Sequence, residues 1–72
     1  MSDHIETGAV KVIEIVGVSK VSFDDAVVQA VQKASQSVKG INGIEVLKYM
    51  ARVEDGGITQ YRADVKLAFP VQ

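Results

Sequence analysis

The residues of this 72-residue chain that could do chemistry are few and widely spaced. Cysteine is absent and His4 is the one histidine, which excludes thiolate metal sites and most zinc frameworks. Asp3, His4 and Glu6 could together bind a metal, although a solvated tail is the simpler interpretation. The serines have no candidate base, and no nucleophile elbow, phosphate loop or dinucleotide fingerprint occurs. The sequence therefore predicts that the protein is not an enzyme.

A second group of carboxylates, Asp24 and Asp25, directly follows Ser22. Serine is a good N-cap, and the helix dipole favours negative charge in the first turn. Capping is therefore the preferred role of the two aspartates, with cation binding as the alternative. No EF-hand loop is present, so a cation site would need carboxylates from separate segments or subunits. The candidates for such a site are Asp24, Asp25, Glu54 and Asp55.

Four elements must position these groups: a strand, a helix and two further strands. The β-branched run 10–16 predicts a short strand that ends at Gly17. Apolar residues at helical spacing then predict a helix from about Ser22 to Val38, stopped by Gly40. We interpret its apolar stripe as core; the stripe comprises Phe23, Ala26, Val27, Ala30, Val31, Ala34 and Val38.

Residues 44–53 and 61–69 predict the remaining strands, and Pro70 ends the last one. Asp55-Gly56 is a strong signal for a type I′ turn, whose two central residues need positive φ, and Gly57 could add a bulge. The usual crossover geometry makes the strands that flank the helix parallel, so the hairpin partner lies between them. The expected fold is α+β: a β-α-β-β unit whose three-stranded antiparallel sheet, ordered first, third, second, wraps around one helix.

One helix covers only one face of such a sheet, and side-chain alternation predicts what lies on each face. The helix side is assigned Leu47, Tyr49, Ala51, Val53, Tyr61, Ala63, Val65, Leu67 and Phe69. The second face is assigned Ile44, Val46, Met50, Glu14, Lys48, Arg52, Arg62, Asp64 and Lys66. Mixed charges beside apolar groups predict a wet subunit interface at Arg52, Arg62, Asp64 and Lys66, with a solvated face as the alternative.

The composition narrows the class of protein. Residues 9–72 form a single domain, which follows a flexible arm at 1–8. A domain this small usually needs a source of stability besides its core. Because the chain has no cysteine to form disulfides, the remaining common source is homo-oligomerisation. The net charge of −1 and the absence of a basic block argue against a nucleic-acid partner. No apolar stretch approaches a membrane span, so we expect a cytoplasmic protein.

Several segments together resemble one known family, the dodecins. The most specific is Lys11-Val12-Ile13-Glu14-Ile15-Val16-Gly17-Val18-Ser19, followed by a capped helix. The other matching segments are Met1 to His4, Ala34 to Ser37, Glu54 to Gly56 and Tyr61 to Phe69. The resemblance implies the fold above, a hollow sphere of twelve subunits, and storage of a flavin such as riboflavin or FMN at subunit contacts.

The resemblance also implies a ligand site, which this chain has altered. Flavin-binding dodecins carry a stacking tryptophan immediately before the second strand, and here that residue is Gly43, followed by Ile44 and Glu45. An arginine of their second strand corresponds to Met50, and a glutamine of their third strand corresponds to Arg62. An arginine cannot reproduce the paired donor and acceptor of a glutamine. The site by resemblance is therefore Gly43, Glu45, Met50 and Arg62, with flavin binding weakened.

Three functional readings follow. The first is a dodecin-like storage shell that binds a small ligand. The second is a cofactor-free structural or calcium-binding assembly, which is implied because these departures resemble a tryptophan-less, calcium-dodecin-like branch of the family. The third is an interaction module that pairs edge strands with another protein. Tyr49 or Tyr61 could stack a ring in place of the missing tryptophan, but core packing is preferred. Arg62 could bind a phosphate or carboxylate across a symmetry axis, but an ion pair with a neighbour's Asp64 or Glu45 is preferred.

Overall fold

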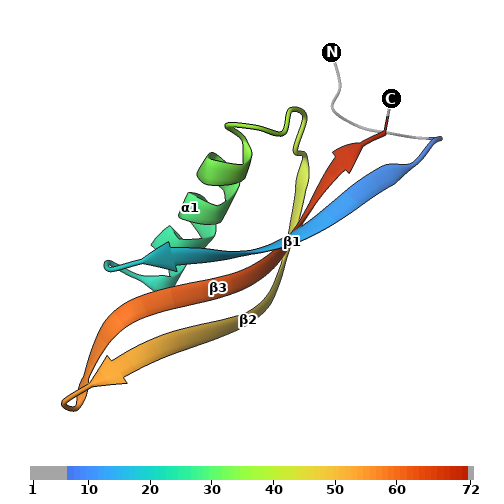
Figure 1. Cartoon of the computed structure of the whole chain (residues 1–72). Helices are drawn as coiled ribbons and strands as arrows, with labels where there is room; N and C mark the ends of the chain where they lie inside the picture. Colours follow the sequence, from blue (N-terminus) through green and yellow to red (C-terminus); the bar gives the residue numbers. More distant parts are fainter. Residues whose placement is uncertain (1–6, 72) are drawn as a thin grey trace.

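The chain forms three strands and one helix in the predicted order. A computed structural model describes residues 7–71, so the metal candidates of the N-terminal arm lie outside the described residues. The elements are β1 (Val10–Ser19), α1 (Phe23–Ala34), β2 (Gly43–Glu54) and β3 (Gly57–Pro70). The molecule is elongated, 50 × 20 × 17 Å, because the β2–β3 hairpin extends well beyond the helix (Figure 1).

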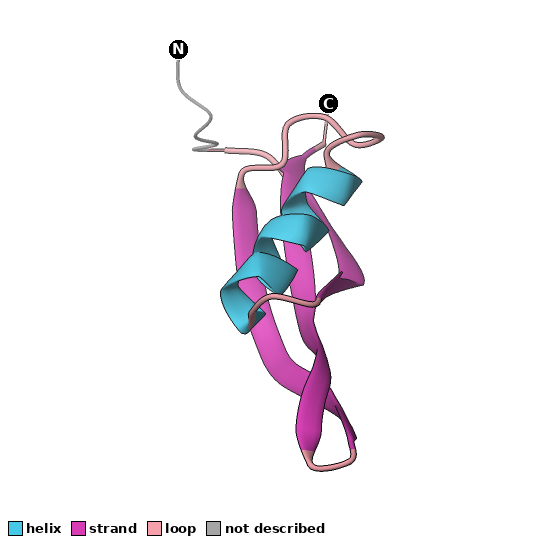
Figure 2. Cartoon of the chain, turned by 90° about the vertical axis from the view of Figure 1, so that its left-hand side faces the viewer, coloured by secondary structure: helices cyan, strands magenta, loops and turns pink. Residues whose placement is uncertain are grey.

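The sheet topology confirms the crossover argument. The strand order is β1-β3-β2, and β3 pairs antiparallel with both neighbours, so β1 and β2 run parallel on either side of it. The helix lies on one face of this sheet (Figure 2), where it packs against β1 and β3. The opposite face of the sheet carries no element of the described chain.

The helix begins as predicted and ends earlier than predicted. Ser22 is the N-cap, and its hydroxyl accepts the backbone N–H of Asp25 at 3.0 Å. The helix stops at Ala34 and not near Gly40, because the Ser35-Gln36-Ser37 segment turns back through i→i+3 bonds such as Ser37 N to Ala34 O. Serine side chains compete for backbone hydrogen bonds, which weakens a helix at such a segment.

The first strand is longer than predicted. It continues past Gly17 to Ser19, and its last residue pairs with Tyr61 of β3. Gly17 is buried, and a Cβ placed there would lie 1.9 Å from the carbonyl oxygen of Ala26 and 2.9 Å from Cβ of Ala30. The glycine is therefore no strand terminator. It is the point where the helix backbone rests directly on the sheet.

The core lies between the helix and the central strand. Its fully buried members are Ala26, Ala30, Ala63, Val65 and Leu67, with Ile13, Ile15, Val27, Val31, Ala34 and Ile41 packed against them. Small residues on the helix bring its axis close to the sheet, and the larger side chains of β3 fill the space. The prediction that the stripe of the helix is core is confirmed for Ala26, Val27, Ala30, Val31 and Ala34, whereas Val38 lies beyond the helix and outside this cluster.

The hairpin confirms the predicted turn and corrects the predicted bulge. Asp55 and Gly56 have φ values of +51° and +81°, as a type I′ turn requires. The bulge lies at Thr59 and not at Gly57, because Arg52 pairs with Gln60 while the next residue, Val53, pairs with Ile58. An extra residue on one strand increases the local twist.

A second bulge, at Leu47, changes the faces of β2. Val46 pairs with Val65 and Lys48 with Asp64, so Leu47 has no partner on β3. Directly paired residues share a face. Val46 therefore shares the helix side with Val65, and Ile44 does so with Leu67, so the prediction that placed Ile44 and Val46 on the second face is wrong.

The close approach at Gly17 makes a prediction about stability. We expect Gly17→Ala to lower the free energy of unfolding by about 1–3 kcal/mol or more, since the new methyl group meets backbone atoms that cannot rotate away. The matched control is Gly43→Ala, whose Cβ would make an ordinary 3.5 Å contact with Cβ of Ala68. Urea unfolding of both variants measures the difference. Equal stabilities would show that the helix does not need this contact distance.

Candidate functional site

The second face of the sheet gathers most of the charged side chains predicted for it. Lys66 on β3 stands between Glu14 of β1 and Glu45 of β2 in the strand register. Asp64 stands between Val16 and Lys48, and Arg62 between Val18 and Met50. Arg52 lies opposite Gln60, one row nearer the hairpin turn. The structure thus brings all four predicted interface residues, Arg52, Arg62, Asp64 and Lys66, to one face.

Asp64 is the unexpected member of this face. Its side chain lies on the face without a helix, yet the residue is only 8% exposed. Its Oδ1 atom is buried and makes no hydrogen bond within the described chain. Sequence reasoning placed Asp64 on an interface but did not predict its burial. The signal was indirect: an aspartate, which is depleted in strands, in the middle of the central strand.

Asp64 raises the pKa of Glu14 above its usual value of 4.5, through a side-chain hydrogen bond first and through its negative charge second. Desolvation raises this pKa further, whereas the charges of Lys66 and Lys48 lower it. Two carboxyl groups this close cannot both ionise without repulsion, so a proton or another positive charge stabilises the pair.

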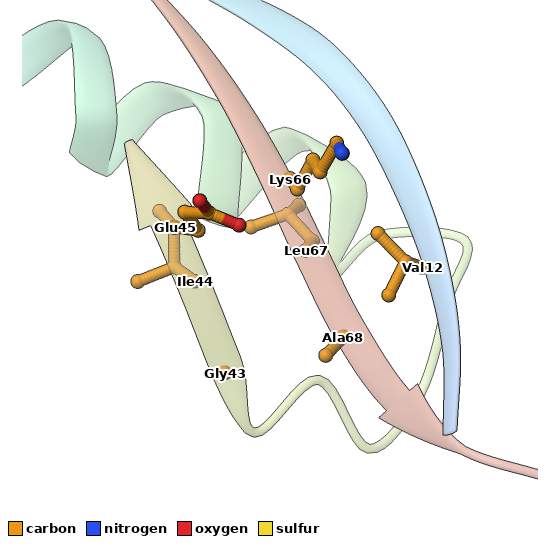
Figure 3. Close-up of a pocket in the computed structure, with 7 residues that line it drawn as sticks. All are labelled: Val12, Gly43, Ile44, Glu45, Lys66, Leu67 and Ala68. Atoms are coloured by element: carbon orange, nitrogen blue, oxygen red, sulfur yellow. The ribbon is translucent and has the colours of Figure 1, made fainter. Parts of the chain in front are cut away.

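A groove opens beside Gly43 on the same face. Its volume is about 390 Å³. It is lined by Val12, Gly43, Ile44, Glu45, Lys66, Leu67 and Ala68, which come from all three strands (Figure 3). The lining is mainly aliphatic, with one carboxylate and one ammonium group in adjacent positions and no aromatic ring. The groove can accept a small, flat or branched molecule, but it has no side chain on which a ring would stack.

The predicted ligand residues separate into two places. Gly43 and Glu45 line the groove, whereas Met50 and Arg62 line a second hollow of about 290 Å³ with Ala51 and Arg52. Arg62 Nε donates to Gln60 Oε1 at 2.6 Å, and Arg52 Nε lies 3.1 Å from Glu54 Oε2. The predicted pairing of Arg62 with a neighbour's Asp64 or Glu45 stays a prediction.

The two tyrosines are packed against the helix. The ring of Phe23, at the start of α1, lies 5.0 Å from that of Tyr49 and 4.9 Å from that of Tyr61. Both tyrosines are therefore on the helix side of the sheet, away from the groove. Tyr61 is partly buried there, whereas Tyr49 is 50% exposed and lies outside the core, so the predicted core packing is not met by Tyr49.

The acidic candidates for a cation site remain apart. The carboxylate of Asp25 accepts a 2.7 Å hydrogen bond from the hydroxyl of Ser19, which also accepts the backbone N–H groups of Val21 and Ser22. Sequence reasoning missed Ser19 as the centre of this junction. Glu54 is paired with Arg52. Within residues 7–71, no three or more His, Asp or Glu side chains gather into a cluster that could hold a metal ion.

The single helix of this part of the chain has neither the length nor the apolar character of a membrane span.

Comparison with known proteins gives one consistent result. The family model described as Dodecin matches residues 9–72. The calcium dodecin of Mycobacterium tuberculosis is 34% identical over 62 residues, which cover 86% of this chain and 87% of the relative. The solved dodecin of Streptomyces coelicolor superposes with a TM-score of 0.89 at 31% identity, covering 94% of this chain and 97% of that one.

A solved structure of the M. tuberculosis calcium dodecin is also similar. It superposes with a TM-score of 0.78 at 33% identity and covers 90% of this chain and 93% of its own. That protein is described as calcium chelating and as having a novel calcium-binding site.

The carboxyl pair predicts a pH dependence. The raised pKa of Glu14 means that the folded chain keeps this proton at pH values where the unfolded chain has lost it. Below pH 4.5 Glu14 is protonated in both the folded and the unfolded state, so the carboxyl pair does not destabilise the fold. As the pH rises from there through the pKa that Glu14 has in the folded state, the free energy of unfolding falls. We expect Glu14→Gln to be more stable than the wild type at neutral pH, with the difference shrinking towards pH 4. Urea unfolding at both pH values tests this; a difference independent of pH contradicts it.

Proposed function

The chain belongs to the dodecin family, and from that premise we propose that it binds and stores a small ligand as a hollow homododecamer. Dodecins are binding and storage proteins and not enzymes, and dodecin homologues form homo-oligomers. The proposal adds three points to this family character: the number of subunits, the place of the ligand at subunit contacts, and a cytoplasmic location.

Exposed apolar surface supports assembly. Val12, Val16 and Val18 on the second face of β1 are 44–50% exposed. On the helix side, the helix packs on β1 and β3 and leaves much of β2 uncovered, so that Ile44 and Tyr49 are 44% and 50% exposed. Apolar surface on both faces of one sheet favours burial against other copies of a chain too small to bury it alone.

The charged residues of the second face support a subunit contact there. We propose that Arg52, Arg62, Asp64 and Lys66 lie at this contact. Arg62 has only the neutral Gln60 as its partner in the described chain, so its charge is available to a carboxylate of another copy. Ion pairs surrounded by valine and methionine side chains are less screened than pairs in open water.

The groove beside Gly43 is the main structural support for the proposed ligand binding. It lies on the face that assembly would cover, and it presents aliphatic walls with Glu45 and Lys66 as polar groups. Such a site suits a small organic molecule held between subunits. Flavin fits the proposal, but with reduced affinity, because the groove has no stacking ring and Arg62 and Met50 replace the family's glutamine and arginine.

Calcium binding without an organic cofactor is the second candidate. It is favoured by a specific observation, the 34% identity to a protein named for calcium, together with the absence of an aromatic ring in the groove. Under this candidate the shell is a structural or ion-buffering assembly. A ligand that binds only the folded state raises its melting temperature, so calcium should then stabilise the particle.

Size and colour test the main proposal. We expect size-exclusion chromatography with light scattering to give a particle of about twelve 7.7 kDa subunits. Absorbance recorded on the same peak reports flavin: a coloured particle supports flavin storage, and a colourless one favours the calcium candidate. A monomer or dimer at micromolar concentration would contradict the shell and leave the edge-strand interaction module.

A tryptophan at position 43 should restore flavin binding. The backbone of Gly43 is not in the positive-φ region, and a Cβ there meets only Cβ of Ala68, so Gly43→Trp can be accommodated. Stacking contributes about 0.5–1.5 kcal/mol, and we expect riboflavin affinity to rise by up to about tenfold. Quenching of flavin fluorescence measures it, with Gly43→Ala as the control that adds no ring. If Gly43→Trp binds no better, Arg62 or the groove shape excludes the ring.

A further inference from the structure

Asp64 presents an unsatisfied buried carboxylate oxygen in the centre of the sheet. The residue is more than nine-tenths buried, and its Oδ1 has no partner in the described chain. A buried acceptor without a partner lowers the stability of the fold, and a charged one lowers it more. Such an atom in a native fold calls for a bound ion, a water or a group from another molecule.

A second carboxyl group converges on the same place. Glu14 lies opposite Lys66 and Val16 opposite Asp64, so Glu14 and Asp64 are diagonal neighbours on adjacent strands and on one face. Diagonal neighbours are about 7–8 Å apart at the backbone, within reach of each other's side chains. Asp64 raises the pKa of Glu14, as a nearby carboxyl group does. The strand register therefore holds two oxygen-rich groups together at a buried atom.

The neighbouring lysines make no direct ion pair with these two carboxylates. Lys48 lies opposite Asp64 and Lys66 lies opposite Glu14, and both side chains are exposed. Neither lysine forms an ion pair within 4.0 Å of these carboxylates among residues 7–71. Their charges lower the pKa of Glu14, but the effect of Asp64 is larger and the pKa is raised overall. The pair therefore keeps room for a cation that contacts it directly.

We propose that Glu14 and Asp64 are ligands of a hard divalent cation of the Ca²⁺ class. Their donors are all carboxylate oxygens, which calcium prefers, and residues 7–71 offer no cysteine or histidine donor that would suit zinc. Two carboxylates supply up to four oxygen atoms and neutralise a divalent charge, while waters complete a coordination shell of six to eight. This inference rests on the calcium candidate of the proposed function and assigns its site.

The other acidic residues are poorer ligands. The carboxylate of Asp25 is held by Ser19, and that of Glu54 by Arg52. Asp24 lies in the first turn of α1, where it interacts favourably with the helix dipole. Asp24 is exposed and belongs to no cluster, which makes it a suitable control for the loss of one negative charge.

The test is calorimetric titration of Ca²⁺ into the assembled protein after removal of metals with a chelator. We expect saturable binding of one ion per subunit by the wild type. Glu14→Gln and Asp64→Asn should each weaken the affinity at least tenfold, whereas Asp24→Asn should leave it within twofold. Calcium should also raise the melting temperature of the wild type and of Asp24→Asn, and not that of the two site variants.

Each contrary result has a definite meaning. Absence of binding by the wild type at millimolar Ca²⁺, or equal binding by Glu14→Gln and wild type, overturns the site. If Asp64→Asn does not assemble, the exposed Glu14→Gln still decides, with circular dichroism confirming its fold. A particle of the expected size that binds flavin but no calcium refutes this site alone, whereas a monomer refutes the shell.

Discussion

The contact between the helix and Gly17 is the constraint on which the rest of the structure depends. The carbonyl oxygen of Ala26 occupies the space that a Cβ at Gly17 would need, and Ala30 presses on the same point. Only small residues on both elements allow a twelve-residue helix to lie this close to a strand. The close contact buries Ala63, Val65 and Leu67 on the central strand, which are three of the five buried core residues among those described.

Because the core is small, much apolar surface of the sheet stays uncovered. The helix packs on β1 and β3, and the hairpin continues beyond it (Figure 2), so much of β2 stays open and no element of residues 7–71 covers the second face. The chain therefore carries valines, an isoleucine and a tyrosine that its own fold leaves half exposed. This fold has a single layer of helix on a single sheet, and its groove beside Gly43 lies on the open face.

The open face contains a charged residue, Asp64, that is buried although no helix covers it. Lys66, Asp64 and Arg62 follow one another at alternate positions of the central strand, which places opposite charges side by side. Asp64 is nevertheless buried. Lys48 lies opposite it on β2 without an ion pair, and the acidic Glu14 is its diagonal neighbour on β1. The register of β1 on β3 creates this juxtaposition, because a shift by one residue would turn Glu14 to the helix side. The groove beside Gly43 lies one row further along the same face.

The sequence by itself determined the order of elements, the N-cap at Ser22, the Asp55-Gly56 turn, the central position of the last strand and the family. These follow from local patterns: alternation, capping and turn chemistry act within a few residues. Only the tertiary structure decided the end of the helix at Ala34, the role of Gly17 and the faces of Ile44 and Val46. One extra residue at Leu47 reverses a period-two pattern, and no local signal marks it. The burial of Asp64 and its approach to Glu14 join residues fifty positions apart, so the strand register, and not either segment alone, decides that they meet.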